Sequence, residues 1–193
     1  MLQGISNAVD FLAKGGLLCM PTDTLFALSC DATNQISIER LYQIKMRDKE
    51  KKMPVLFHNI DHVMEYCHIN DKELELLKRF WPGKLTMILN LKSHKLSILG
   101  NNIAARVPNC TQILEIIHRL NRPIIGTSAN ISGCNNINTL QKAIDLFSSS
   151  EVKIFQNNRQ ISGIQSTIIS LINDKINIIR EGAISVEEIL SKS

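Results

Sequence analysis

Short apolar runs alternate with amphipathic segments along this chain, and the alternation is its most constraining feature. Residues 5–12 carry apolar side chains at helical spacing and stop at two glycines, after which residues 17–20 form an apolar run. The first pattern is typical of a helix that ends at glycine, and the second of a buried strand. The alternation predicts an α/β fold in which helices flank a sheet.

The same patterns predict the remaining elements. We expect helices at residues 38–45, 71–80, 111–120 and 139–147, and strands at residues 54–57, 85–91, 103–107 and 123–127. Residues 166–172 and 176–180 are predicted strands joined by a short polar connection that suits a hairpin. Residues 185–188 fit a capping box that opens a last short helix. The sheet should therefore be a twisted mixed parallel and antiparallel one, and residues 1–193 a single domain.

Composition narrows the functional class. With 44% hydrophobic and 21% charged residues, the chain is typical of a globular protein and not of a disordered one. Its 22 basic and 18 acidic residues leave a net charge of +4, which suits an anionic partner but falls short of a dedicated DNA binder. Five widely spaced cysteines without a C-x-x-C pair favour reduced thiols. The N-terminal residues do not resemble a signal peptide, so we expect a cytoplasmic protein with no membrane contact.

Several polar segments follow the predicted strands, where α/β sheets commonly expose ligand-binding groups. The first is the hydroxyl and carboxyl cluster PTDT at 21–24, and another is the loop GTSANISG at 126–133. Residues 45–52 hold five cations, which fit either a solvated turn or a polyphosphate site. Arg106 ends an apolar strand and would need an anionic partner if buried. His58, His62, Cys67 and His68 could be drawn as a metal cluster, but no carboxylate-rich surroundings support it.

Seven segments in this order resemble the YrdC family of threonylcarbamoyl-AMP synthases across residues 15–184. They are PTDTLFAL, KMR with KKMPVLFH, WPGKLT, ARVP, TSANISG, STII and IREG. The resemblance implies an α/β domain with a basic concave face. It also implies an enzyme that joins L-threonine, bicarbonate and ATP into threonylcarbamoyl-AMP and pyrophosphate, with Mg²⁺ on the phosphates. A tRNA threonylcarbamoyl transferase complex would then modify the adenosine beside the anticodon, and tRNA itself could contact this protein.

The resemblance also assigns residues. It puts Lys45, Arg47, Lys52, Asn130 and Arg180 on ATP. It puts Thr24, His58, Arg106, Ser128 and Ser166 around threonine. No protein nucleophile is implied, so Lys45 and Arg47 would act by positioning and charge neutralisation.

Three departures from the family pattern stand out. Ala27 replaces a usual glycine, the segment between Arg47 and Pro54 is longer than usual with Met53 before the proline, and the chain resembles the short form of the family. Two other functions are alternatives. One is a module that binds double-stranded RNA or tRNA without catalysis, although aromatic residues for base stacking are few. The other is a relative that makes a carbamoyl-adenylate for hydrogenase maturation.

Overall fold

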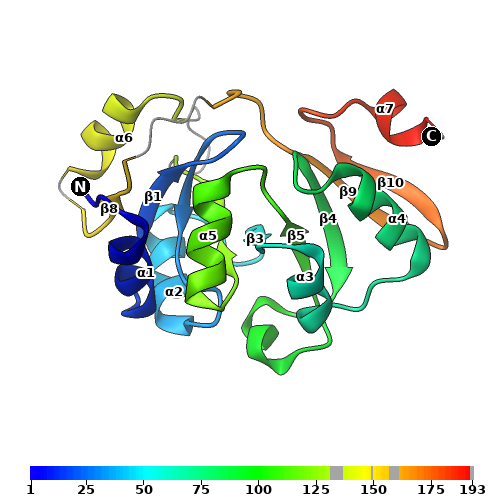
Figure 1. The fold of residues 1–193 in the computed structure, drawn as a ribbon, viewed down its shortest axis with the longest axis horizontal. Coiled ribbons are helices and arrows are strands. Elements are labelled where there is room, and N and C mark those ends of the chain that lie inside the picture. Colours follow the sequence, from blue (N-terminus) through cyan, green and yellow to red (C-terminus); the bar gives the residue numbers. More distant parts are fainter. Residues whose placement is uncertain (131–136, 149, 157–160, 192–193) are drawn as a thin grey trace.

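The computed structural model describes residues 1–130, 137–148, 150–156 and 161–191 (Figure 1). Its helices are α1 (Ile5–Ala13), α2 (Gln35–Ile44), α3 (Ile60–Tyr66), α4 (Asp71–Phe80), α5 (Thr111–Leu120), α6 (Leu140–Phe147), α7 (Val186–Leu190) and the 3-10 helix η1 (His94–Leu99). Its strands are β1 (Leu18–Pro21), β2 (Phe26–Ser29), β3 (Val55–Leu56), β4 (Leu85–Asn90), β5 (Asn102–Arg106), β6 (Ile124–Ile125), β7 (Thr127–Ser128), β8 (Lys153–Ile154), β9 (Thr167–Ile172) and β10 (Lys175–Arg180). The predicted mixed α/β class is confirmed.

The strands form two sheets. One has four strands in the order β7-β2-β1-β8, and the other has six in the order β10-β9-β4-β5-β3-β6. Both contain parallel and antiparallel pairs, as the hairpin pattern predicted. The prediction of one strand over residues 123–127 is wrong, because β6 and β7 belong to different sheets. The chain changes sheet at Gly126, where a Cβ atom would lie 2.4 Å from a methyl carbon of Leu56.

Local signals account for several element ends. Asn70 and Glu73 form a reciprocal capping box at the start of α4, each side chain accepting from the other's backbone N–H at 2.9 Å. Ser185 caps α7 by accepting from the backbone N–H of Glu188. The β9–β10 hairpin turns at Asn173 and Asp174, with φ of 50° and 61°. Paired left-handed residues are typical of tight hairpin turns. The predicted hairpin and the predicted last helix are both confirmed.

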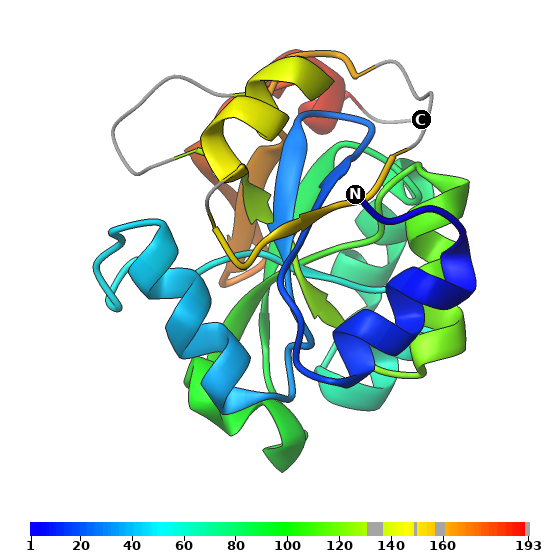
Figure 2. The same ribbon diagram turned by 90° about the vertical axis from the view of Figure 1, so that its left-hand side faces the viewer.

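The four-stranded sheet is covered on both faces. Successive side chains of a strand point to opposite faces. Leu18 and Met20 of β1 pack in a cluster with residues of α1 and α5, while Cys19 packs in the cluster that contains Leu41 of α2. Helices α1 and α5 lie side by side on their face (Figure 2). β1 and its neighbours are thereby held rigidly, which fixes the turn that follows β1.

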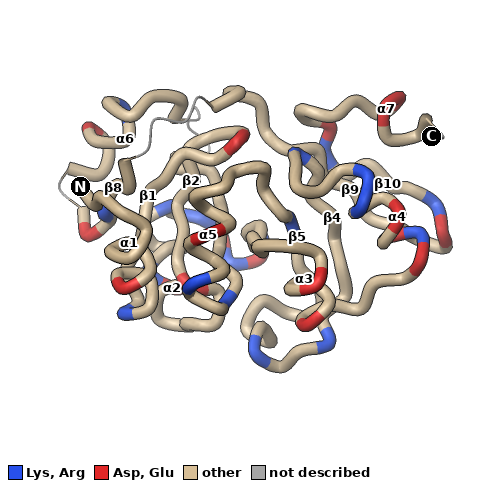
Figure 3. The backbone as a smooth tube through the Cα atoms, viewed as in Figure 1, with Lys and Arg blue, Asp and Glu red and all other residues tan. Residues whose placement is uncertain are grey.

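Charged positions are interspersed over the fold. Figure 3 shows basic and acidic residues along most elements without a block of one sign. The N-terminus and the C-terminus lie at opposite ends of the long axis (Figure 1).

Among the described residues, no helix is long and apolar enough to cross a membrane. Cys19, Cys30, Cys67 and Cys110 are buried, and burial raises the pKa of the Cys19 thiol to about 12. All four are therefore part of the packed interior, and Cys134 lies outside the described residues.

Candidate active site

One edge of the six-stranded sheet gathers three of the expected residues. Arg106 is the last residue of β5, Arg180 is the last of β10, and Ser166 directly precedes β9. β4 runs antiparallel to β5 and parallel to β9, and β10 runs antiparallel to β9. The ends of β5 and β10 and the start of β9 consequently lie at the same edge.

The four-stranded sheet and the loop after α2 supply the rest. A cavity of about 270 Å³ lies between these parts, and Thr22, Thr86, Ala27, Leu56 and Ile88 contribute to its wall. Seven of the residues expected from the sequence also line it: Thr24, Arg47, Lys52, Arg106, Ser128, Ser166 and Arg180. The structure therefore joins segments that are up to 156 positions apart, from Thr24 to Arg180.

The turn between β1 and β2 is shaped by a buried hydroxyl. Thr22 Oγ1 accepts from the backbone N–H groups of Thr24 at 3.0 Å and Leu25 at 3.2 Å, and donates to the Leu25 carbonyl at 2.8 Å. Side-chain bonds of this kind replace backbone pairing in a tight turn. The turn holds the Thr24 hydroxyl 3.1 Å from Nη1 of Arg106.

Arg106 is buried, and each of its three guanidinium nitrogens donates to a neighbour. Its Nε donates to the Gly83 carbonyl at 2.8 Å, its Nη1 to Thr24, and its Nη2 to Oδ1 of Asp23 in an ion pair. Burial lowers the pKa of Arg106, and the Asp23 carboxylate opposes that effect. The anionic partner that the sequence required is therefore part of the protein. Asp23 was not singled out as a site residue, although it stands in the cluster PTDT that signalled the site.

Ser166 and Arg180 form a second group. Arg180 donates from Nε and Nη2 to the Ser166 carbonyl, at 3.1 and 2.8 Å, and from Nη2 to Ser166 Oγ at 3.2 Å. Ser166 Oγ is also 2.8 Å from the buried hydroxyl of Thr86, a further residue that the sequence reasoning missed. Burial lowers the pKa of Arg180, and the charges of Arg106 and Arg47 lower it further. An anion in the cavity would relieve that repulsion.

Lys45 lies behind the cavity wall. It follows α2, is 1% exposed, and its Nζ donates to the carbonyls of Ser128 and Asn130 and to Oδ1 of Asn130 at 3.3 Å. Ser128 Oγ in turn donates to Oδ1 of Asn130 at 2.6 Å. Burial, with a contribution from Arg47, lowers the pKa of Lys45 to about 8. Lys45 and Asn130 therefore support Ser128 and do not themselves line the cavity.

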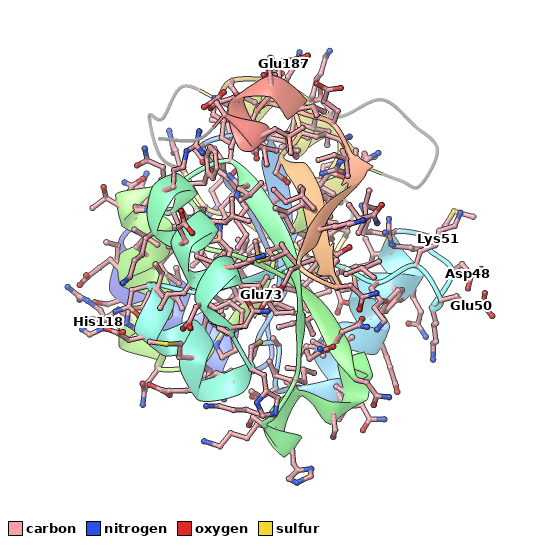
Figure 4. All side chains as sticks on the ribbon, turned by 90° about the vertical axis from the view of Figure 1, so that its right-hand side faces the viewer. Asp48, Glu50, Lys51, Glu73, His118 and Glu187 are labelled. Carbon is pink, nitrogen blue, oxygen red and sulfur yellow. The ribbon has the colours of Figure 1, made fainter. Side chains whose placement is uncertain are left out.

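The cationic segment after α2 folds partly onto itself. Arg47 donates to the carbonyl of Lys51 at 2.8 Å and to that of Lys52 at 3.1 Å, while Nζ of Lys52 donates to the carbonyl and side chain of Asn102. The side chains of Asp48, Glu50 and Lys51 project outward from this loop (Figure 4). The segment is thus divided between a cavity wall and a solvated face, so both interpretations of the sequence apply to part of it.

The cavity carries an excess of positive charge. Among the described residues, Arg106 is the one site cation within ion-pair distance of a carboxylate. The contacts given above for the other four site cations, Lys45, Arg47, Lys52 and Arg180, are to carbonyl, amide or hydroxyl oxygens. Unpaired guanidinium and ammonium groups at one wall are the usual surroundings of a polyphosphate. The cavity therefore suits an anionic ligand that Arg47 and Arg180 could contact.

His58 is an expected residue that neither lines this cavity nor contacts its wall as Lys45 and Asn130 do. β3 ends at Leu56, and His58 turns toward α3 and α5, where its Nδ1 lies 2.9 Å from Nδ1 of His62 and its ring centroid 5.2 Å from that of His118. It lines a separate hollow beside α3 and α4. Burial, and secondarily His58, lowers the pKa of His62 to about 4.

The other possible metal ligands do not form a cluster. α3 ends at Tyr66, so Cys67 and His68 lie beyond the helix and not on it. In the described ranges, no three His, Cys, Asp or Glu residues are grouped so as to hold a metal ion. Ala27, by contrast, does bear on the site, since it pairs with Ser128 and lines the cavity. Gly133 lies outside the described residues.

Comparisons with known proteins agree with this geometry. The sequence model of the Sua5/YciO/YrdC family, described as telomere recombination, matches residues 10–182. A threonylcarbamoyl-AMP synthase of Aliivibrio fischeri is 27% identical over 161 residues, which cover 80% of this chain and 87% of that protein. A variant of Sua5 from Pyrococcus abyssi has the same fold, with a TM-score of 0.90 and 27% identity over 96% of this chain. A Sua5 structure from that organism complexed with L-threonine gives a TM-score of 0.86 at 24% identity. This chain spans 55% and 59% of those two structures.

Proposed function

This chain belongs to the Sua5/YciO/YrdC family, and from that premise we propose that it is an L-threonylcarbamoyladenylate synthase. It condenses L-threonine, bicarbonate and ATP into threonylcarbamoyl-AMP and releases pyrophosphate. The observation that carries the proposal is the cavity itself, where cations without carboxylate partners lie together with several hydroxyl groups. A polyphosphate and a small hydroxylated amino acid match these two kinds of group.

The nucleotide occupies the side with unpaired cations. Arg47 and Arg180 line the cavity and carry charge that no carboxylate in the described residues neutralises, and Lys52 lies beside them. Lys45 acts from behind, since it fixes Asn130 and Ser128 and adds positive charge at short range. This arrangement neutralises the triphosphate and the pyrophosphate that leaves.

Threonine occupies the side of Arg106. Three of the five N–H groups of this guanidinium are used within the protein, so one remains on each terminal nitrogen. Two N–H groups so arranged can bind a carboxylate in a bidentate manner. The hydroxyls of Thr24, Ser128 and Ser166 are then available for the polar groups of threonine. His58 is left out of this proposal because it does not line the cavity.

The chemistry requires no protein nucleophile. The threonine amine attacks the carbon of bicarbonate, water leaves, and an oxygen of the resulting carbamate attacks the α-phosphorus while pyrophosphate departs. The protein accelerates these steps by holding three reactants together and by neutralising charge. The residues that line the cavity include no carboxylate among those described, so Mg²⁺ would enter with ATP, held by the phosphate oxygens.

The product is an acyl-phosphate anhydride, which water would hydrolyse if it were released without protection. A tRNA threonylcarbamoyl transferase complex therefore receives it and transfers the threonylcarbamoyl group to the adenosine beside the anticodon of tRNA, with tRNA contacting this protein at most in passing. We place this reaction in the cytoplasm and assign it to residues 1–193 acting as one domain.

Pyrophosphate release by the purified protein tests the proposal. ATP, threonine, bicarbonate and Mg²⁺ are supplied together and then omitted one at a time, and we expect release only in the complete mixture. An unchanged rate without threonine would refute the synthase. Tight, salt-sensitive binding of double-stranded RNA or tRNA without any pyrophosphate release would support the RNA-binding module in its place.

A further inference from the structure

Asp23 distinguishes one cation of the cavity from the others. Its side chain is 3% exposed and that of Arg106 is 7% exposed, so the ion pair between them lies out of water. Oδ2 of Asp23 also accepts from the backbone N–H of Asn109 at 3.2 Å. Asp23 therefore sits directly behind Arg106, and it is not among the described residues that line the cavity.

Two kinds of cation result from this pairing. Arg47 and Arg180 present net positive charge to the cavity, and attraction between net charges acts over several ångströms in every direction. Asp23 offsets part of the positive charge of Arg106, so the pair offers directed N–H groups but attracts a group with several negative charges less than an unpaired guanidinium does. A phosphate chain at Arg106 would also approach the Asp23 carboxylate, which would repel it.

We propose that Asp23 is a specificity-determining residue that reserves Arg106 for a singly charged carboxylate and leaves polyphosphate to Arg47 and Arg180. The inference rests on the proposed function, because the carboxylate is that of the amino-acid substrate. Asp23 thereby prevents ATP from occupying the threonine subsite in a reversed orientation. Excluding the wrong ligand by unfavourable charge is a common route to specificity.

A purely structural role for Asp23 must be separated from this one, because the same carboxylate holds the backbone of Asn109. Asp31 provides a matched control. Its side chain is 1% exposed, it pairs with Arg122 at 2.6 Å, and it accepts from the backbone N–H of Thr33 at 2.9 Å. It therefore has the same burial, the same kind of partner and a backbone contact, but it lies outside the cavity.

Calorimetric titration of L-threonine in the absence and presence of saturating inorganic tripolyphosphate tests the proposal. The wild type is compared with Asp23→Asn, Asp23→Glu and the control Asp31→Asn. Tripolyphosphate should raise the apparent Kd of threonine less than about twofold in the wild type, Asp23→Glu and Asp31→Asn. In Asp23→Asn it should raise the apparent Kd of threonine about tenfold, as expected for a competitor supplied at about ten times its own Kd.

Competition in the wild type, or its absence from Asp23→Asn, would overturn the proposal. Equal competition in Asp23→Asn and Asp31→Asn would also do so, since it would assign the effect to general loosening. If Asp23→Asn does not fold, Asp23→Ser takes its place as the uncharged variant and the same outcomes apply. Wild-type synthase activity is measured separately, so an inactive wild type refutes the proposed function, whereas an active one without the Asp23 effect refutes only this inference.

Discussion

The hydroxyl of Thr167 should be the strongest single polar anchor of the C-terminal segment. Thr167 is the first residue of β9 and is fully buried. Its Oγ1 accepts from the backbone N–H of Gly182 at 2.9 Å and of Ile184 at 3.1 Å, and donates to the Ile184 carbonyl at 2.6 Å. We therefore choose Thr167→Val, which keeps the shape of the side chain and removes all three hydrogen bonds.

The expected cost follows from the groups left without partners. A buried N–H or C=O without a partner costs about 1–3 kcal/mol. The bonds to Ile184 are fully buried, whereas Gly182 is partly exposed and can find water. Counting the two Ile184 groups, we expect the free energy of unfolding to fall by about 3 kcal/mol. For a chain of 193 residues this lowers Tm by about 6–12 °C.

Thermal unfolding followed by calorimetry measures this change, with Thr167→Ser as the matched control. Serine keeps the hydroxyl and loses one methyl group, which costs about 1 kcal/mol, or about 2–4 °C. A Tm of Thr167→Val equal to that of Thr167→Ser would show that packing of the methyl group, and not the three hydrogen bonds, holds the segment.

Three other predictions use the same protein. Arg47→Ala should lower kcat/KM about 100-fold or more without changing Tm, while the exposed Lys49→Ala stays within about twofold of wild type; equal activity of both would refute a role for Arg47. Gly126→Ala should lower the free energy of unfolding by about 1–3 kcal/mol, because the new Cβ would lie 2.4 Å from Leu56. Denaturant titrations measure this loss, and adding Leu56→Val should recover part of it. The pKa of Lys45 is about 8 in the folded protein and 10.5 ordinarily. Between these two pH values the unfolded chain holds a proton on Lys45 that the folded protein has lost, so the free energy of unfolding should rise with pH across this range. Binding of ATP should restore the positive charge of Lys45, which then takes up about half a proton at pH 8. Calorimetry in buffers of different ionisation enthalpy measures this uptake, and Lys45→Met should remove it.

Local sequence patterns predicted what depends on neighbours in the chain. The helices at 71–80 and 111–120 have the bounds expected, because capping residues and apolar periodicity act within a few positions. The division of 123–127 into β6 and β7 was missed because it depends on partners far away in sequence, β3 for β6 and β2 for β7. β2, β8 and η1 were missed as well, since such short segments carry little periodicity.

Single residues of the site could be predicted from the sequence, but the contacts between them could not. Hydroxyl, amide and basic residues next to predicted strands indicated Thr24, Ser128 and Arg106. That Asp23 neutralises Arg106, 83 positions later, depends on how the two sheets meet. His58 was assigned by resemblance alone, and its turn toward His62 follows from where β3 ends.

The single-residue link between the two sheets has a consequence for how the protein opens. Thr24 and Ser128 come with one sheet, Arg106 and Arg180 with the other, and Gly126 connects them. Neither sheet alone therefore holds all of the binding groups, and the site is complete only when the two sheets are in place. Ligands that contact both halves must slow amide hydrogen exchange along the seam at residues 124–128 more than at distant helices. Exchange protection there would report site assembly directly, without any turnover.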